Sequence, residues 1–147
     1  MHKIPYLESI VKETLRKYPP CSVLPRTVTA DECQLNGIPL KRGTFINIAA
    51  HAIHHSEEYY PQPERFDPER FMPENRDKLI PYTFMPFGLG PRNCVGMRFA
   101  YQEIQYCIGR LLLTYHFDRT PETPLQLTFV KGTPIMQSLP FKLKITK

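Results

Sequence analysis

The sequence predicts an α+β fold in which a long irregular segment separates two halves. Apolar residues recur at helical spacing in two stretches, β-branched residues alternate with turn residues between positions 23 and 48, and prolines concentrate between positions 61 and 91. Seven of the 16 prolines fall in that last stretch, so regular secondary structure is not expected there.

Length and composition restrict the classes of protein to consider. The chain has 147 residues, of which 41% are hydrophobic and 22% charged, as in one globular domain. Its net charge is +5, without a run of like charges that would indicate nucleic-acid binding, so we expect no nucleic-acid partner. No apolar run reaches the ~18 residues of a membrane span, and the charged start precedes no signal-peptide core.

The first half is expected to contain one helix followed by short strands. Six residues share helical spacing near the start: Leu7, Ile10, Val11, Thr14, Leu15 and Tyr18. Pro19-Pro20 would end this helix. Asn36-Gly37 is typical of a tight hairpin turn, and residues 44–48 of a strand. We also expect Ser56 to cap one short helix.

The second half is expected to contain a long helix and a terminal β-hairpin. Six residues after Cys94 share one helical stripe: Met97, Ala100, Ile104, Ile108, Leu111 and Tyr115. Apolar and polar residues alternate in 125–129 and again in 141–145, which indicates two paired strands. The coil between the halves exceeds the ~12–15 residues that a compact domain usually leaves unstructured, which indicates a functional segment.

The cysteines and histidines form no recognised metal pattern. The cysteines are Cys21, Cys33, Cys94 and Cys107. They include no CxxC pair and no disulfide framework, so neither a zinc ribbon nor an oxidising compartment is expected. An alternative zinc set would join Cys94 to three neighbouring histidines: His51, His54 and His55. Because this set lacks a second thiolate or an acidic ligand at fixed spacing, we do not favour it.

The most informative stretch is the loop from Phe87 to Gly96, which precedes the long helix. A cysteine at the start of a helix lies near the positive end of the helix dipole and near free N–H groups, which favour the metal-binding thiolate. Gly88 and Gly96 let the backbone approach a flat, bulky partner, and Arg92 adds a permanent cation. A ligand with a metal and carboxylates, such as haem, suits this loop. The alternative is that Cys94 is a small apolar residue buried under the helix.

Five residues of this loop fill the pattern Phe-x-x-Gly-x-Arg-x-Cys-x-Gly: Phe87, Gly90, Arg92, Cys94 and Gly96. The pattern resembles the haem-ligand signature of the cytochrome P-450 superfamily, the haem-thiolate monooxygenases. The resemblance implies that Cys94 is the catalytic residue and the iron ligand of haem b (iron protoporphyrin IX). It also implies that Arg92 holds a haem propionate, and that Phe87, Gly88 and Gly96 help to form the cofactor site.

Two further motifs occur in the order that the family has them. Glu13 and Arg16, at i and i+3 of the first predicted helix, match the family's Glu-x-x-Arg motif, and Arg70 lies in a Pro-Glu-Arg-Phe segment of the coil. The resemblance implies that these three residues form a structural triad that locks the coil against the helix. Arg26 resembles the family arginine that holds a haem propionate. Taken alone, each of these charges would be interpreted as a solvated surface group.

The resemblance also implies the fold and its extent. We expect the C-terminal part of a mainly helical fold, with a Glu-x-x-Arg helix, small β-sheets, a proline-rich meander, a cysteine loop, a long helix and a terminal hairpin. Residues 1–147 would form one partial domain, the proximal haem-binding portion, without the N-terminal anchor and the distal helices. Residues 21–24 and 133–135 would border the substrate pocket. The family often has arginine, aspartate and tryptophan where His55, Ser56 and Tyr60 stand here.

The first functional hypothesis is the haem-binding portion of a monooxygenase that inserts one atom of O2 into a lipophilic organic substrate. The sequence around Cys94 looks most like animal microsomal members, which implies the cytosolic face of the endoplasmic reticulum membrane, with no anchor in this chain. Electrons would come from NADPH through a flavoprotein reductase, with cytochrome b5 as a further partner, and the basic charge suits an acidic partner.

Two alternatives remain open from the sequence. One is a truncated, non-catalytic haem-binding or interaction remnant of the family, and we expect no turnover from this chain alone. The other is a thiol hydrolase that uses Cys94 as its nucleophile. A hydrolase would need a general base placed beside the sulfur, and no such base is evident.

Overall fold

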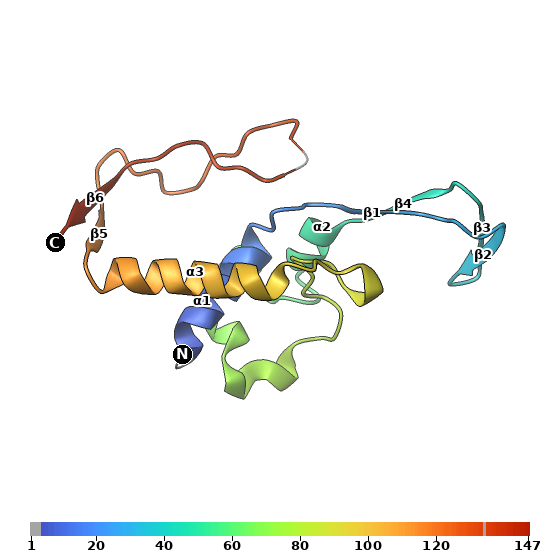
Figure 1. Ribbon diagram of the computed structural model, residues 1–147, viewed down its shortest axis with the longest axis horizontal. Helices are drawn as coiled ribbons and strands as arrows, with labels where there is room; N and C mark the ends of the chain where they lie inside the picture. The colour runs from blue at the N-terminus through green and yellow to red at the C-terminus, as the bar shows by residue number, and fades with distance from the viewer. Residues whose placement is uncertain (1–3, 134) are drawn as a thin grey trace.

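The computed structural model describes residues 4–133 and 135–147, and its mixture of helices and small antiparallel sheets confirms the predicted α+β fold. The helices lie in the body of the molecule, one strand hairpin projects from it, and the last strands lie at the opposite end (Figure 1). Pro134, in the tip expected to border a substrate pocket, lies outside the described residues, as do residues 1–3.

Helix α1 (Pro5–Lys17) forms where the apolar spacing predicts it. It begins at a proline, whose missing N–H costs nothing in the first turn, and it ends before Pro19. Its buried face carries polar as well as apolar side chains: Ser9, Val11, Glu13, Leu15 and Arg16. A helix that buries charged residues must supply them with partners inside the protein.

Four short strands follow α1 and pair as two antiparallel ribbons: β1 (Leu24–Thr27) with β4 (Phe45–Ile48), and β2 (Glu32–Leu35) with β3 (Ile38–Lys41). Asn36 and Gly37 connect β2 to β3 with φ values of 50° and 80°. Two positive φ values in a two-residue loop are what the tight hairpin turn requires, so the predicted turn is confirmed. This β2–β3 hairpin is the part that projects from the body (Figure 1).

The predicted helix after Ser56 is wrong. Helix α2 (Ala50–His54) ends before Ser56. The Ser56 carbonyl accepts hydrogen bonds from the N–H groups of Tyr59 (3.2 Å) and Tyr60 (2.9 Å), so the residues after it form a single turn. A backbone acceptor at this position closes the turn, and the side chain caps no helix.

The only helices described in the proline-rich coil are short: η1 (Pro68–Phe71), η2 (Pro73–Lys78) and η3 (Gly90–Arg92). Each of these 3₁₀ helices has a proline in its first two positions, where the fixed φ of proline suits a helical start. The segment therefore has little regular backbone hydrogen bonding, and other contacts must hold it in place.

The C-terminal half begins with the predicted long helix, α3 (Met97–Leu112), but the predicted partner of the last strand is wrong. Strand β6 (Leu143–Thr146) pairs with β5 (His116–Arg119), and residues 125–129 form no strand. An isolated bridge joins Phe129 to Ser138, and the Phe129 ring packs 5.4 Å from the ring of Tyr18. This segment therefore contacts Tyr18, the residue that follows α1, and does not pair with the last strand.

The core is small and contains charged and polar side chains. Among the described residues, the buried apolar ones are Val11, Leu15, Val28, Ala50, Tyr60, Phe71 and Met85. Glu13, Arg16 and His54 are buried beside them at 0% exposure. Helix α3, which the structure describes throughout, has no buried residue. No helix in the described part of the chain has the length and hydropathy that crossing a membrane requires.

We expect replacement of Phe71 by alanine to lower the free energy of unfolding by about 3–5 kcal/mol, because it leaves a cavity in this small core. Phe71 is 7% exposed and its ring lies 4.7 Å from that of Phe84. The control is Phe45→Ala, at a ring that is 64% exposed, which should cost about 0.5 kcal/mol. Urea denaturation measures both, and equal losses would contradict this description of the core.

Candidate functional site

Glu13 and Arg16 form a bidentate ion pair inside the protein. Arg16 Nε lies 2.8 Å from Glu13 Oε2, and Arg16 Nη2 lies 2.8 Å from Glu13 Oε1. Both side chains are 0% exposed. The i, i+3 spacing on α1 brings the two groups together, and the planar guanidinium matches the carboxylate.

Backbone groups from two other segments complete this ion pair. Arg16 donates to the carbonyl of His54 at 2.7 Å and to that of Pro63 at 2.8 Å. Glu13 Oε1 accepts the N–H of Asp67 at 2.9 Å. A buried charge is stable only when its hydrogen-bonding capacity is filled, so the pair holds both α2 and the proline-rich coil against α1.

Arg70, the third residue expected in the triad, lies beside the same carboxylate. Its Nε is 3.7 Å from Glu13 Oε1, which is an ion-pair distance and too long for a hydrogen bond. This buried Nε has no hydrogen-bond partner among the described residues. Arg70 Nη2 donates to the carbonyls of Pro61 at 2.6 Å and Gln62 at 3.0 Å. Arg70 therefore hydrogen-bonds two carbonyls of its own coil, and its contact with Glu13 is an ion pair without a hydrogen bond.

His54 is a central residue, although its place in the sequence indicated only an alternative metal ligand. Its Nδ1 lies 3.1 Å from the Arg16 carbonyl, and its Nε2 accepts the N–H of Met85 at 2.9 Å. Burial lowers the pKa of His54 to about 4. The local sequence does not distinguish His54 from His51 or His55, and only its burial and partners do.

The alternative zinc set is not assembled. His54 uses both ring nitrogens for backbone hydrogen bonds, whereas the rings of His51 and His55 stack on each other with centroids 4.1 Å apart. Burial also lowers the pKa of His51. Within 4–133 and 135–147, no group of three or more His, Cys, Asp or Glu side chains could hold a metal ion.

Cys94 lies three residues before the start of α3, with its side chain exposed. Its N–H donates to the carbonyl of Phe87 at 2.8 Å, which closes the loop between the two residues, and its carbonyl accepts the N–H of Met97 at 3.3 Å. The exposure of Cys94 overturns the alternative of a small residue buried under the helix. Gly96, the residue before α3, adds no side chain beside the sulfur, where a Cβ would lie 3.9 Å from Sγ.

Phe87 and Gly88 attach this loop to its neighbours. The Phe87 ring packs 5.2 Å from the ring of Tyr101 on α3, and burial raises the pKa of Tyr101 to about 12. Gly88 has a φ of +72°, which favours glycine. A Cβ at Gly88 would lie 3.7 Å from the Cα of Asn93 and 3.9 Å from Arg26 Nη2, so the Arg26 guanidinium reaches the loop.

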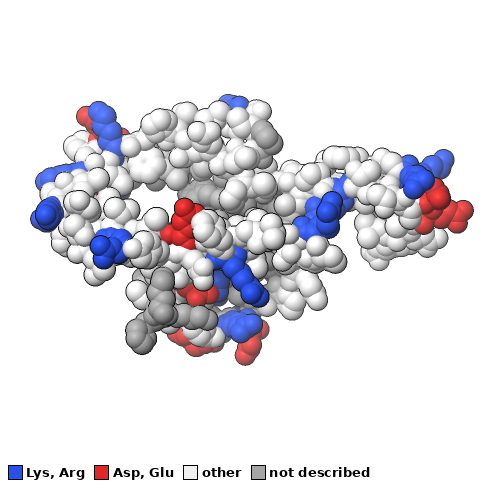
Figure 2. Space-filling model, in the orientation of Figure 1, with Lys and Arg blue, Asp and Glu red and all other residues white. Residues whose placement is uncertain are grey.

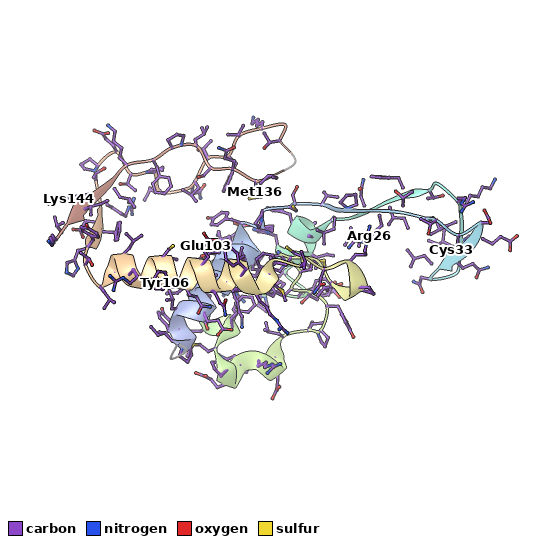
Figure 3. All side chains as sticks on the ribbon, viewed as in Figure 1. Arg26, Cys33, Glu103, Tyr106, Met136 and Lys144 are labelled. Atoms are coloured by element: carbon purple, nitrogen blue, oxygen red, sulfur yellow. The ribbon has the colours of Figure 1, made fainter. Side chains whose placement is uncertain are left out.

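Two guanidinium groups at the cysteine loop are available to an anionic ligand. Arg92 is exposed, and Arg26 is half-buried with its Nη1 bonded to the carbonyl of Pro25 at 2.8 Å. Neither has a carboxylate within 4.0 Å in the part of the chain that the structure describes. Figure 3 shows Arg26 on the side from which the β2–β3 hairpin projects. A thiol sulfur and two cations are a suitable donor set for a metal complex that carries acidic groups.

The net positive charge is not gathered into one region of the visible surface. Figure 2 shows Lys and Arg side chains interspersed with Asp and Glu on the face it presents. Electrostatic recognition at the loop therefore depends on the local positions of Arg26 and Arg92 more than on the net charge of +5.

The two segments expected to border a substrate pocket lie together. An antiparallel bridge joins Cys21 to Ile135, and the Met136 N–H donates to the carbonyl of Pro20 at 2.8 Å. Leu24, at the start of β1, follows on the same strand as Arg26. Strand β1, which carries Arg26, thus begins three residues after Cys21, where the two segments meet.

Comparison with known proteins agrees with the sequence motifs. The family described as Cytochrome P450 matches residues 1–145. The chain is 37% identical to Cytochrome P450 3A41 of Mus musculus and 39% identical to Cytochrome P450 3A9 of Rattus norvegicus, over 95% of this chain and 28% of either relative. It is 43% identical to Thromboxane-A synthase of Mus musculus, over 84% of this chain and 24% of that protein. The chain thus spans about a quarter of the length of these relatives.

Replacing Glu13 with glutamine should lower the free energy of unfolding by about 3–5 kcal/mol, because it leaves the Arg16 charge buried beside a neutral amide. The matched control is Glu8→Gln on the same helix. The Glu8–Lys12 pair is 2.7 Å long but about one-third exposed, so its loss should cost about 0.5 kcal/mol. Chemical denaturation measures the free energy of unfolding of both variants. Similar losses of free energy would show that the buried Glu13–Arg16 pair contributes no more than an exposed pair.

Stability should fall as the pH drops from about 6.5 to about 4, because the unfolded chain then binds a proton at His54 that the folded chain does not. Inside that window, the contribution of this residue to the slope of the free energy of unfolding against pH approaches about 1.4 kcal/mol per pH unit. Above the window this contribution vanishes. His54→Gln should flatten the slope, while His116→Gln, which keeps His54, should retain it. Thermal or urea unfolding across the pH range measures the slope, and an unchanged slope in His54→Gln contradicts the assignment.

Proposed function

Because this chain belongs to the cytochrome P450 family, we propose that it is the haem-binding portion of a monooxygenase whose iron ligand is the Cys94 sulfur. One observation carries this proposal: Cys94 is exposed at the entrance to α3, in a loop closed by its own N–H, with two guanidinium groups that lack carboxylate partners nearby among the described residues. We further propose that residues 1–147 form one partial domain, its proximal side.

The residues present fit haem b. Cys94 offers a thiolate sulfur without a side chain at Gly96 to cover it, and Arg26 and Arg92 offer charged donors for two propionates. Gly88 leaves the space between Arg26 and the loop free of a side chain. When bound, haem would supply the activation of O2 for insertion of one oxygen atom into a lipophilic organic substrate.

The protein's own contribution is to hold the Cys94 sulfur at a fixed position. The sulfur lies near the positive end of the α3 dipole, because Cys94 is three residues before the helix. The closed Phe87–Cys94 loop fixes the backbone, and the packing of Phe87 on Tyr101 fixes the loop against α3. Glu13, Arg16 and Arg70 hold the coil that leads into this loop, so their role is structural.

The proposal extends to the partners and location of the complete enzyme. Electrons would come from NADPH through a flavoprotein reductase, and cytochrome b5 would be a further donor. The similarity to the mammalian relatives supports a location at the cytosolic face of the endoplasmic reticulum membrane. Residues 21–24 and 133–135, whose described parts meet at the Cys21–Ile135 bridge, would border the substrate.

A second candidate is a non-catalytic module that binds haem or another polypeptide. Helix α3 favours it, because no residue of this fully described helix is buried. Phe99 is 68% exposed and Leu113, just after the helix, is 81% exposed. Such apolar side chains indicate a surface that another polypeptide covers. Turnover of a lipophilic substrate with reductase and NADPH separates an enzyme from such a module.

The carbon monoxide difference spectrum of the reduced, haem-loaded chain tests the proposed ligand. Thiolate ligation should give a strongly red-shifted Soret band, and Cys94→Ser should abolish it because serine offers no thiolate. Cys107→Ser, at another exposed cysteine on α3, should retain the band and is the matched control. A red-shifted band in Cys94→Ser would show that the assigned ligand is wrong.

A further inference from the structure

The ring of His54 joins the buried ion pair to the segment that enters the cysteine loop. His54 Nδ1 lies 3.1 Å from the carbonyl of Arg16, and the N–H of Met85 lies 2.9 Å from His54 Nε2. Arg16 in turn donates to the His54 carbonyl at 2.7 Å. One imidazole therefore contacts α1 through one nitrogen and the chain before Cys94 through the other.

The hydrogen bonds determine which nitrogen of His54 carries the proton. A backbone N–H can only donate, so Nε2 must accept the bond from Met85 and carries no proton. A carbonyl can only accept, so Nδ1 must carry the proton that it donates to Arg16. The neutral ring thus satisfies one acceptor and one donor that are 69 positions apart in the sequence. Few other side chains can accept at one end and donate at the other with a rigid spacing.

The position of this ring is fixed by its surroundings. His54 is 0% exposed, and its ring stacks on Phe84 with centroids 5.7 Å apart. The Tyr60 ring packs edge-on at 6.3 Å, and the Tyr60 hydroxyl lies 3.2 Å from Thr83 Oγ1. The aromatic rings and the chain just before Met85 therefore enclose the imidazole.

Met85 continues directly into the cysteine loop. Its carbonyl accepts the N–H of Gly88 at 3.0 Å, and the carbonyl of Phe87 accepts the N–H of Cys94 at 2.8 Å. Met85 is 7% exposed, so the bond to His54 anchors the buried end of a loop whose other end, at Cys94, is exposed. A shift of Met85 would move Phe87 and Gly88, and with them the acceptor of the Cys94 N–H.

We infer that His54 is a positioning residue that sets where the cysteine loop lies relative to the buried Glu13–Arg16 pair. The geometric part of this inference depends only on the contacts above. Its consequence for haem ligation rests on the proposed function, because it concerns the distance between the Cys94 sulfur and the iron. His54 acts through Met85 and does not itself touch a ligand.

Two amide variants separate the two bonds of His54. Asparagine places its amide near the position of Nδ1 and can reach the Arg16 carbonyl, but it is too short to reach Met85. Glutamine places its amide near the position of Nε2 and can accept the Met85 N–H. We expect the amide hydrogen-exchange rates of Met85 and Cys94 to be up to about tenfold higher in His54→Asn than in His54→Gln. The reason is that the asparagine variant loses one buried hydrogen bond that the glutamine variant keeps.

The comparison does not depend on both variants having equal stability. The readout is the exchange rate of Met85 and Cys94 divided by that of Val11, a buried residue of α1 more than one turn away from Arg16, within the same variant. His55→Asn and His55→Gln are the matched controls, because His55 follows α2 directly and its Nδ1 bonds to His51. This ratio should be the same in both controls. An equal ratio in His54→Asn and His54→Gln would overturn the inference.

A spectroscopic measurement tests the consequence at the sulfur. In the haem-loaded, reduced, carbon monoxide-bound chain, His54→Asn should lose part of the red-shifted Soret band that His54→Gln retains. The proposed function fails if Cys94→Ser keeps that band, whatever the exchange rates show. The positioning role is tested when Cys94→Ser abolishes the band. It fails if His54→Asn and His54→Gln then have equal exchange ratios, or if they retain equal fractions of the red-shifted Soret band.

Discussion

The buried ion pair between Glu13 and Arg16 is the interaction on which the rest of the structure depends. Two opposite charges at 0% exposure must fill their hydrogen-bonding capacity from the protein itself. The backbones of His54, Pro63 and Asp67 provide those partners. A proline-rich coil has few backbone hydrogen bonds of its own, so these contacts to α1 determine its course.

The same ion pair is connected by hydrogen bonds to the cysteine loop, which it does not touch. Arg16 and His54 share two hydrogen bonds. The Arg16 guanidinium donates to the His54 carbonyl, and His54 Nδ1 donates to the Arg16 carbonyl. His54 engages Met85, which leads into the loop that ends at Cys94. The contacts from Arg16 through His54 to Met85 are directional hydrogen bonds between buried residues, and a satisfied network of this kind rigidifies the core.

Local patterns predicted the local structure well and the pairing of distant segments poorly. The apolar spacing of α1 and α3 and the Asn36-Gly37 turn depend on neighbouring residues, and the structure confirms them. The partner of the last strand was wrong, because alternation indicates a strand without indicating its neighbour. Strand β5 pairs with β6, while residues 125–129 lie where Phe129 packs on Tyr18.

The sequence by itself determined the family and the chemical types at the site: a cysteine, two arginines and glycines at the spacing of one motif. Only the tertiary structure decided that Cys94 is exposed, that Arg26 reaches Gly88, and that His54 is the buried histidine among three neighbours. The reason is physical. Chemical identity belongs to a single residue, whereas burial and hydrogen-bond partners arise from segments such as those of His54 and Met85, 31 positions apart, that meet only in the folded chain.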